Sequence, residues 1–163
     1  MPNKLDLPEI QSMVLQEVVE AKVKSAWNEL QVPLLVEDVS FSLDAMKGFP
    51  GPFVKFWQEK AGYDLAVKIA DELGNNRVTV SCGVAYFDGN EVLYTEGSVQ
   101  GKIVAKREGE GFPGGFDFYF VPDGSNLAFS EMGLEAKNAI SHRFRGWSEM
   151  KHLLIEKGII DAD

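Results

Sequence analysis

Apolar residues recur along this chain with two different periods, and the change between them predicts the order of helices and strands. Apolar positions three and four residues apart between Ser12 and Leu30 predict an amphipathic helix, with Ser12 as its N-cap. The short apolar run of residues 34–36 predicts a buried strand that presents Glu37 and Asp38 at its C-terminal end. The same criteria predict helices over residues 52–60, 64–73, 134–140 and 144–157, and strands over residues 77–87, 91–99, 101–105 and 118–122. This order of elements indicates an α/β protein.

Two segments rich in glycine interrupt this pattern. Residues 47–53 contain two prolines and two glycines, which predicts a loop. Residues 108–117 are also rich in glycine, but they have neither the spacing of a phosphate-binding P-loop nor that of a dinucleotide-binding turn. A mobile loop is the simplest interpretation of this second segment. Its aromatic residues Phe112, Phe116 and Phe118 lie in a polar loop with little hydrophobic core to pack against. They are therefore candidates for stacking on a nucleobase.

The composition narrows the classes of protein. The 163 residues carry a formal net charge of −9, with 45% hydrophobic and 25% charged residues, as expected for one globular domain over residues 1–163. The acidic balance argues against a partner that is a nucleic-acid polymer, but not against a nucleotide. The lone cysteine, Cys82, is interpreted as a buried structural thiol in a reducing compartment. With neither a signal peptide nor an apolar run long enough for a membrane span, we expect a cytoplasmic protein without a membrane partner.

Two groups of polar residues are candidates for chemistry. Glu37 and Asp38 are hard oxygen ligands of the kind that Mg²⁺ prefers, and either could act as a general base; the alternative is a solvated, acidic end of a strand. Residues 137–145 gather three cations, a histidine and a serine in an otherwise acidic chain. A bound phosphate explains this concentration of cations, and so does the C-terminus of a helix, whose dipole attracts positive charge.

Taken together in chain order, these segments resemble the inosine triphosphate pyrophosphatase family from about residue 5 to residue 150. The matching segments are residues 6–9 (Asp-Leu-Pro-Glu), 35–38 (Leu-Val-Glu-Asp), 48–55 (Gly-Phe-Pro-Gly-Pro-Phe-Val-Lys), 101–104, 115–117, 120–124, 131–132 and 137–143 (Lys-Asn-Ala-Ile-Ser-His-Arg). The resemblance implies an α/β fold with a mixed central sheet flanked by helices and two lobes around a cleft. It also implies Mg²⁺-dependent hydrolysis of purine nucleoside triphosphates such as ITP, dITP and XTP to the monophosphate and pyrophosphate.

The resemblance implies a role for each matching residue. Asp38 would be the general base or metal ligand that activates water, with Glu37 beside it, and Glu9 would be a further carboxylate on the metal. The implied substrate-binding residues are Lys55 near the phosphates, Phe116 and Asp117 in the base pocket, and Lys137, Ser141, His142 and Arg143 around the phosphates and the purine 6-oxo group. A cationic donor such as Arg143 or His142 favours a 6-oxo purine over adenine, because adenine presents an amino donor at that position.

The chain departs from the family pattern at three places. The family opens with a strand, a helix and a Thr/Ser-Gly-Asn-x-x-Lys loop that grips the triphosphate, and nothing here matches them, so we expect an N-terminally truncated member. Val39 stands where the family has Thr or Ser. The base-pocket motif reads Gly-Gly-Phe-Asp-Phe over residues 114–118 instead of Phe-Gly-Tyr/Trp-Asp-Pro, and Phe112 is a substitute stacker if its loop folds back.

These departures leave three functions open: the hydrolase, a noncatalytic protein that binds a nucleotide or phosphorylated metabolite, and a partner subunit of a full-length homologue. A missing strand would also expose an unpaired sheet edge. We therefore expect a homodimer in which the second copy covers that edge.

Overall fold

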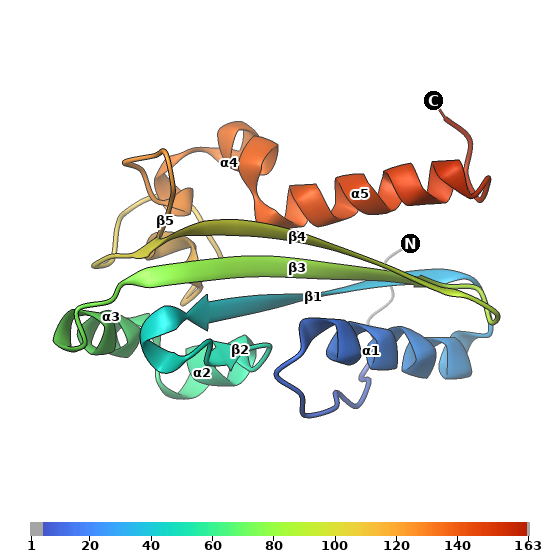
Figure 1. Ribbon diagram of the computed structural model, residues 1–163, viewed down its shortest axis with the longest axis horizontal. Coiled ribbons are helices and arrows are strands. Elements are labelled where there is room, and N and C mark those ends of the chain that lie inside the picture. The colour runs from blue at the N-terminus through green and yellow to red at the C-terminus, as the bar shows by residue number, and fades with distance from the viewer. Residues whose placement is uncertain (1–4, 163) are drawn as a thin grey trace.

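The computed structural model describes residues 5–162, in which a long five-stranded sheet carries helices on both sides (Figure 1). The strands are β1 (Leu34–Leu43), β2 (Pro50–Gly51), β3 (Arg77–Phe87), β4 (Val92–Ile103) and β5 (Phe120–Pro122). The helices are α1 (Leu15–Leu30), α2 (Val54–Lys60), α3 (Tyr63–Glu72), α4 (Leu134–Ile140) and α5 (His142–Glu156). In Figure 1 the helices α1, α2 and α3 lie below the long strands, and α4 and α5 lie above them. No helix within residues 5–162 has the length and the apolar character needed to cross a bilayer.

The sheet is antiparallel throughout the described residues, in the order β2-β1-β3-β4-β5. The expected mixed sheet is therefore wrong for this part of the chain. A tight connection at residues 88–91 joins β3 to β4, where the Asp88 carboxylate accepts hydrogen bonds from the backbone N–H groups of Asn90 and Glu91. Such a short connection permits only antiparallel pairing, since a parallel pair needs a long crossover.

Two of the three central strands, β1 and β4, are longer than the sequence pattern suggested. β1 continues through Leu43 instead of ending before Glu37, so Glu37 and Asp38 lie in the middle of a strand. The predicted strands 91–99 and 101–105 form one strand, β4. Gly101 lies within this strand and permits the close approach of β5, because a Cβ there would lie 2.3 Å from the carbonyl oxygen of Val121 on β5.

Separate apolar clusters hold the helices on the sheet. From α1, Val19 and Val23 pack on one face against Ala85 of β3, whereas from α5 Met150 packs in a cluster with Cys82 of β3. Burial, followed by the charge of Glu37, raises the pKa of the Cys82 thiol to about 12, so the thiol stays protonated at neutral pH. This agrees with the interpretation of Cys82 as a structural residue.

One edge of the sheet is open. β2 pairs with β1 only at Phe41 and Ser42, and residues 34–40 of β1 have no strand partner on that side among the described residues. Asp38 satisfies part of this edge with its own side chain, since its Oδ1 accepts a hydrogen bond of 2.8 Å from the backbone N–H of Val39. The charged residues of β1 thus lie at an otherwise unpaired edge.

Candidate active site

A cavity of about 540 Å³ opens between β1, the glycine-rich loop and the α4–α5 corner. We call it the aromatic cavity. Its lining residues are Val39, Gln58, Phe112, Gly115, Phe116, Asp117, Leu134, Lys137, Asn138, Ser141, His142, Arg143, Phe144 and Trp147. The structure therefore brings together six of the residues that the sequence singled out for substrate binding, from two segments of the chain.

The α4–α5 corner places the cations of the aromatic cavity. Ser141 ends α4 and is the N-cap of α5, where its Oγ accepts a hydrogen bond of 3.1 Å from the backbone N–H of Phe144. Arg143 therefore lies in the first turn of α5 rather than at the end of a helix. The N-terminus of a helix has free backbone N–H groups and a positive dipole, which favour an anion. Lys137 from α4 faces the same cavity and forms an ion pair with Asp117.

His142 is buried between aromatic rings in this corner. Its ring is stacked at 11° on Phe129 and lies 5.6 Å, centroid to centroid, from Phe116. Burial, helped by the charges of Arg143 and Lys137, lowers the pKa of His142 to about 3. The ring is neutral at neutral pH, so the expectation that His142 acts as a cationic donor is wrong, although a neutral imidazole still donates one N–H. Its buried Nδ1 has no hydrogen-bond partner within residues 5–162, which leaves that atom available to a ligand.

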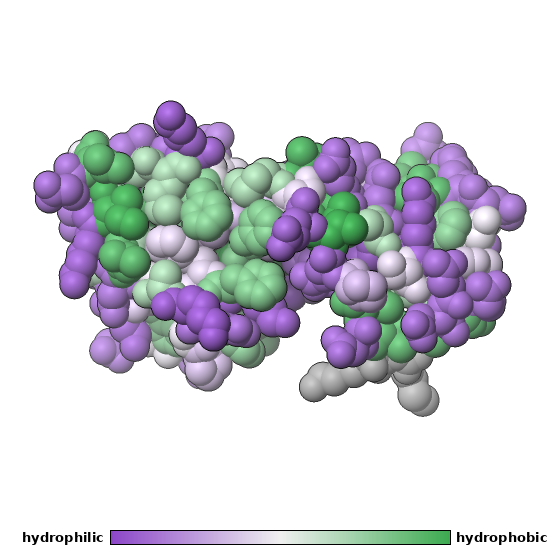
Figure 2. Space-filling view, turned by 90° about the horizontal axis from the view of Figure 1, so that it is seen from below, coloured by the Kyte–Doolittle hydropathy of each residue, from purple (hydrophilic) through white to green (hydrophobic). Residues whose placement is uncertain are grey.

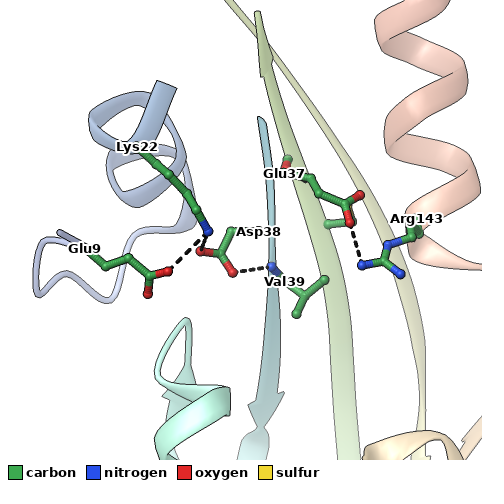
Figure 3. A network of polar contacts seen from close by, with 8 residues as sticks. Glu9, Lys22, Glu37, Asp38, Val39 and Arg143 are labelled. Carbon is green, nitrogen blue, oxygen red and sulfur yellow. Dashed lines mark hydrogen bonds and ion pairs between the residues drawn. The ribbon is translucent and has the colours of Figure 1, made fainter. Parts of the chain in front are cut away.

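Glu37, on strand β1, orients Arg143 of α5 (Figure 3). The Glu37 carboxylate forms an ion pair with Arg143 and accepts a hydrogen bond from the indole Nε1 of Trp147. Both partners come from α5, so Glu37 lies on the α5 side of the sheet. The sequence analysis missed Trp147, because its contact with Glu37 joins residues 110 positions apart.

Asp38 points to the opposite side of the sheet, towards α1 (Figure 3). Lys22 Nζ lies 3.1 Å from Asp38 Oδ2 and 3.2 Å from Glu9 Oε1, and we call these three residues the acidic cluster. Burial alone lowers the pKa of Lys22, but the two carboxylates outweigh burial and raise it. The expectation that Glu37 acts beside Asp38 is thus wrong, because neighbouring residues of a strand point to opposite faces.

The sequence analysis also did not predict a role for Lys22, although the spacing of the buried residues on α1 indicated one. Val18 and Ala26 are buried on α1, and Lys22 stands midway between them at a spacing of four residues. A lysine on the buried stripe of an amphipathic helix needs a partner for its charge. Here the partners are Asp38 and Glu9.

A second cavity of about 360 Å³ adjoins the acidic cluster. Its walls include Glu9, Lys22 and Lys55, and we call it the acidic cavity. Figure 2 shows the face that carries α1, α2 and α3, with an indentation between the α2–α3 part and the α1 part. Lys55 therefore lies with Glu9, and away from the residues of the aromatic cavity.

Helix α2 lines both cavities, and strand β1 connects the acidic cluster to the aromatic cavity. Helix α2 contributes Lys55 to the acidic cavity and Gln58 to the aromatic cavity. Strand β1 contributes Asp38 to the acidic cluster and the next residue, Val39, to the aromatic cavity. A ligand lying across the open edge of β1 can therefore contact both sets of residues.

The acidic cluster has the donor chemistry for a magnesium ion. Residues 5–162 contain no group of three or more His, Cys, Asp and Glu side chains placed to hold a metal. Mg²⁺ nevertheless needs only one or two protein carboxylates when substrate phosphates complete its coordination. Glu9 and Asp38 converge on one cation, the Lys22 ammonium, so the two carboxylates lie close enough to share a cation.

Comparisons with known proteins show the family of this chain. The chain belongs to the Ham1 family, whose model matches residues 1–153. It is 38% identical to the inosine triphosphate pyrophosphatase of Yarrowia lipolytica, over 95% of this chain and 82% of the relative. It is 35% identical to a dITP/XTP pyrophosphatase of Thermococcus kodakarensis, over 94% of this chain and 82% of the relative. The family resemblance that the sequence suggested is thereby confirmed.

The fold is shared with solved structures. The Ham1 protein of Staphylococcus aureus superposes with a TM-score of 0.80 at 23% identity, covering 94% of this chain and 82% of that one. A HAM1 protein from Coxiella burnetii gives a TM-score of 0.81 at 21% identity, over 92% of this chain and 82% of that one. At these identities the likeness concerns the fold.

Proposed function

We propose that this protein hydrolyses noncanonical purine nucleoside triphosphates such as ITP, dITP and XTP to the nucleoside monophosphate and pyrophosphate. The observation that carries the proposal is the pair of cavities that helix α2 lines in common, one with aromatic and cationic residues and the other with carboxylates and lysines. The two curated relatives described above are named for pyrophosphatase activity on inosine triphosphate and on dITP and XTP.

In the proposed mode of binding, the purine occupies the aromatic cavity. Phe116 and Asp117 form its floor, and Lys137, Ser141, His142 and Arg143 surround the polar edge of the base and the nearest phosphate. The ion pair of Lys137 with Asp117 and that of Arg143 with Glu37 hold both cations in place before substrate arrives. Preorganised donors favour the 6-oxo acceptor of hypoxanthine or xanthine over the amino group of adenine.

The phosphate chain then extends towards the acidic cavity. In this proposal Asp38 accepts the proton of an attacking water, and Glu9 and Asp38 are the residues that would hold Mg²⁺. A bound Mg²⁺ would neutralise charge on the phosphate oxygens. Lys22 and Lys55 supply further positive charge on the same side of the sheet. Glu37 acts by positioning Arg143, since its contacts lie on the other face.

The first experiment measures pyrophosphate release from ITP, XTP, dITP, ATP and GTP in the presence of Mg²⁺. We expect release from ITP and XTP to exceed release from ATP, and EDTA to abolish it. A folded sample that releases no pyrophosphate from any triphosphate overturns the proposal. Thermal stabilisation by nucleotide without turnover then indicates a noncatalytic binding protein. Activity that appears only with a second protein indicates a partner subunit.

We further propose that the protein is a cytoplasmic homodimer whose second copy covers the open edge of β1 at residues 34–37 and leaves the edge at Asp38 and Val39 to the ligand. An unpaired edge of seven residues, 34–40, is a surface that proteins usually cover or blunt. Sedimentation equilibrium at micromolar concentration is expected to give twice the monomer mass of 18.1 kDa. A single species of monomer mass would contradict the dimer and leave the catalytic proposal standing.

A further inference from the structure

The glycine-rich loop contains a defined turn at the mouth of the aromatic cavity. The backbone N–H of Gly115 donates a hydrogen bond of 2.8 Å to the carbonyl oxygen of Phe112. Between them stand Pro113 and then Gly114, whose φ is +75°. Proline in the second position and a residue with positive φ in the third are the requirements of a type II β-turn. The turn folds the loop back, so that Phe112 lines the cavity.

The Phe112 side chain is largely exposed at this position. It is 70% exposed, and its ring makes no contact with another aromatic ring in the described part of the chain. Phe116, by contrast, packs against Phe41, Tyr63 and His142. Of these two loop phenylalanines, the one with a free ring face is therefore Phe112.

Gly114 serves the conformation of the turn rather than its packing. A Cβ added at Gly114 would meet only the side chain of Gln58, at 3.9 Å, so space does not require glycine there. The positive φ does require it, because other residues rarely adopt that conformation. The turn thus fixes the position of its first residue, Phe112. This residue is an exposed aromatic at the entrance of the aromatic cavity.

We propose that Phe112 is a substrate-contacting residue that stacks on the nucleobase, held by the 112–115 turn as a flap over the aromatic cavity. The inference rests on the proposed function and adds a base contact from the loop to those of the α4–α5 corner. Aromatic rings stack on every base, so Phe112 strengthens binding without distinguishing one purine from another. Discrimination stays with the polar residues of the cavity.

Steady-state kinetics with ITP test the flap. Phe112→Ala is expected to raise KM roughly ten- to a hundredfold, with little change in kcat, because the loss of one base stack weakens binding by about that factor. Phe112→Trp is expected to restore KM, and Phe112→Leu to restore only part of it, since leucine has no π face. Inhibition by inorganic triphosphate, which has no base, is expected to be unchanged. The matched control is Leu73→Ala, which removes a side chain that is 60% exposed at the end of α3, outside both cavities.

A second variant tests the turn with the ring still present. Gly114→Ala strains the positive φ and is expected to raise KM in the same direction, with a small fall in the unfolding midpoint because alanine at a positive φ is destabilising. A wild-type KM in Phe112→Ala, in an enzyme that hydrolyses ITP, overturns the inference and leaves the function intact. If ITP binds without turnover, the same comparison is made with calorimetric Kd values. If wild type does not bind ITP at all, the inference and the proposed function both fall.

Discussion

Asp38→Asn is expected to lower kcat for ITP hydrolysis by roughly a hundred- to ten-thousandfold, the range usual for loss of a general base. Asparagine has nearly the shape of aspartate, but it cannot accept the proton of water and brings no negative charge to a metal ion. The change is measured as the rate of pyrophosphate release at saturating ITP and Mg²⁺. The expected loss is large because the variant removes both the proposed base and one of the two carboxylates of the acidic cluster.

The same variant should fold normally, which separates catalysis from stability. The amide oxygen of asparagine can still accept the hydrogen bond from the backbone N–H of Val39, and Lys22 keeps its ion pair with Glu9. The matched control is Asp44→Asn, at an exposed aspartate just after β1, which is expected to retain the wild-type rate. A kcat of Asp38→Asn within a few-fold of wild type would mean that another group activates the water.

The local pattern of the chain predicted most of the helices and strands. The range 134–140 matches α4, and 77–87 matches β3, because both segments have a clear period and glycine or asparagine near their ends. The strand β1 was predicted too short. Its continuation alternates the apolar Val39, Phe41 and Leu43 with serines, which is the period of a strand with one buried face.

This error of length had a direct effect on the candidate site. If Glu37 and Asp38 ended a strand, both could turn towards one ligand. Within a strand they must point to opposite faces, and each acquires a different cation: Arg143 for Glu37 and Lys22 for Asp38. These pairs join residues far apart in the sequence, so spacing could not reveal them. The identity of the charged residues could be predicted, but not their division between two sides of the sheet.

The placement of α5 depends on two glycines at a crossing. A Cβ on Gly97 of β4 would lie 2.2 Å from the backbone nitrogen of Gly146 and 2.4 Å from the carbonyl oxygen of His142. Both atoms belong to the backbone of α5, so no rotation of a side chain relieves the clash. The hydroxyl of Thr95 also donates a hydrogen bond of 2.9 Å to the carbonyl oxygen of Gly146, which fixes the helix at this distance from the strand.

Gly97→Ala is accordingly expected to destabilise the protein by about 3 kcal/mol, at the upper end of the range for overpacking in a well-packed interior. Urea unfolding measures the loss, and Gln100→Ala, at an exposed position on the same strand, is expected to change stability by less than about 0.5 kcal/mol. Because α5 must move away from β4, His142 and Arg143 move with it, and KM for ITP should rise in the molecules that remain folded. Unchanged stability would mean that α5 lies farther from β4 than the contact between Gly97 and Gly146 implies. Loss of stability with an unchanged KM would show that the cations of the first turn do not depend on the glycine contact for their position.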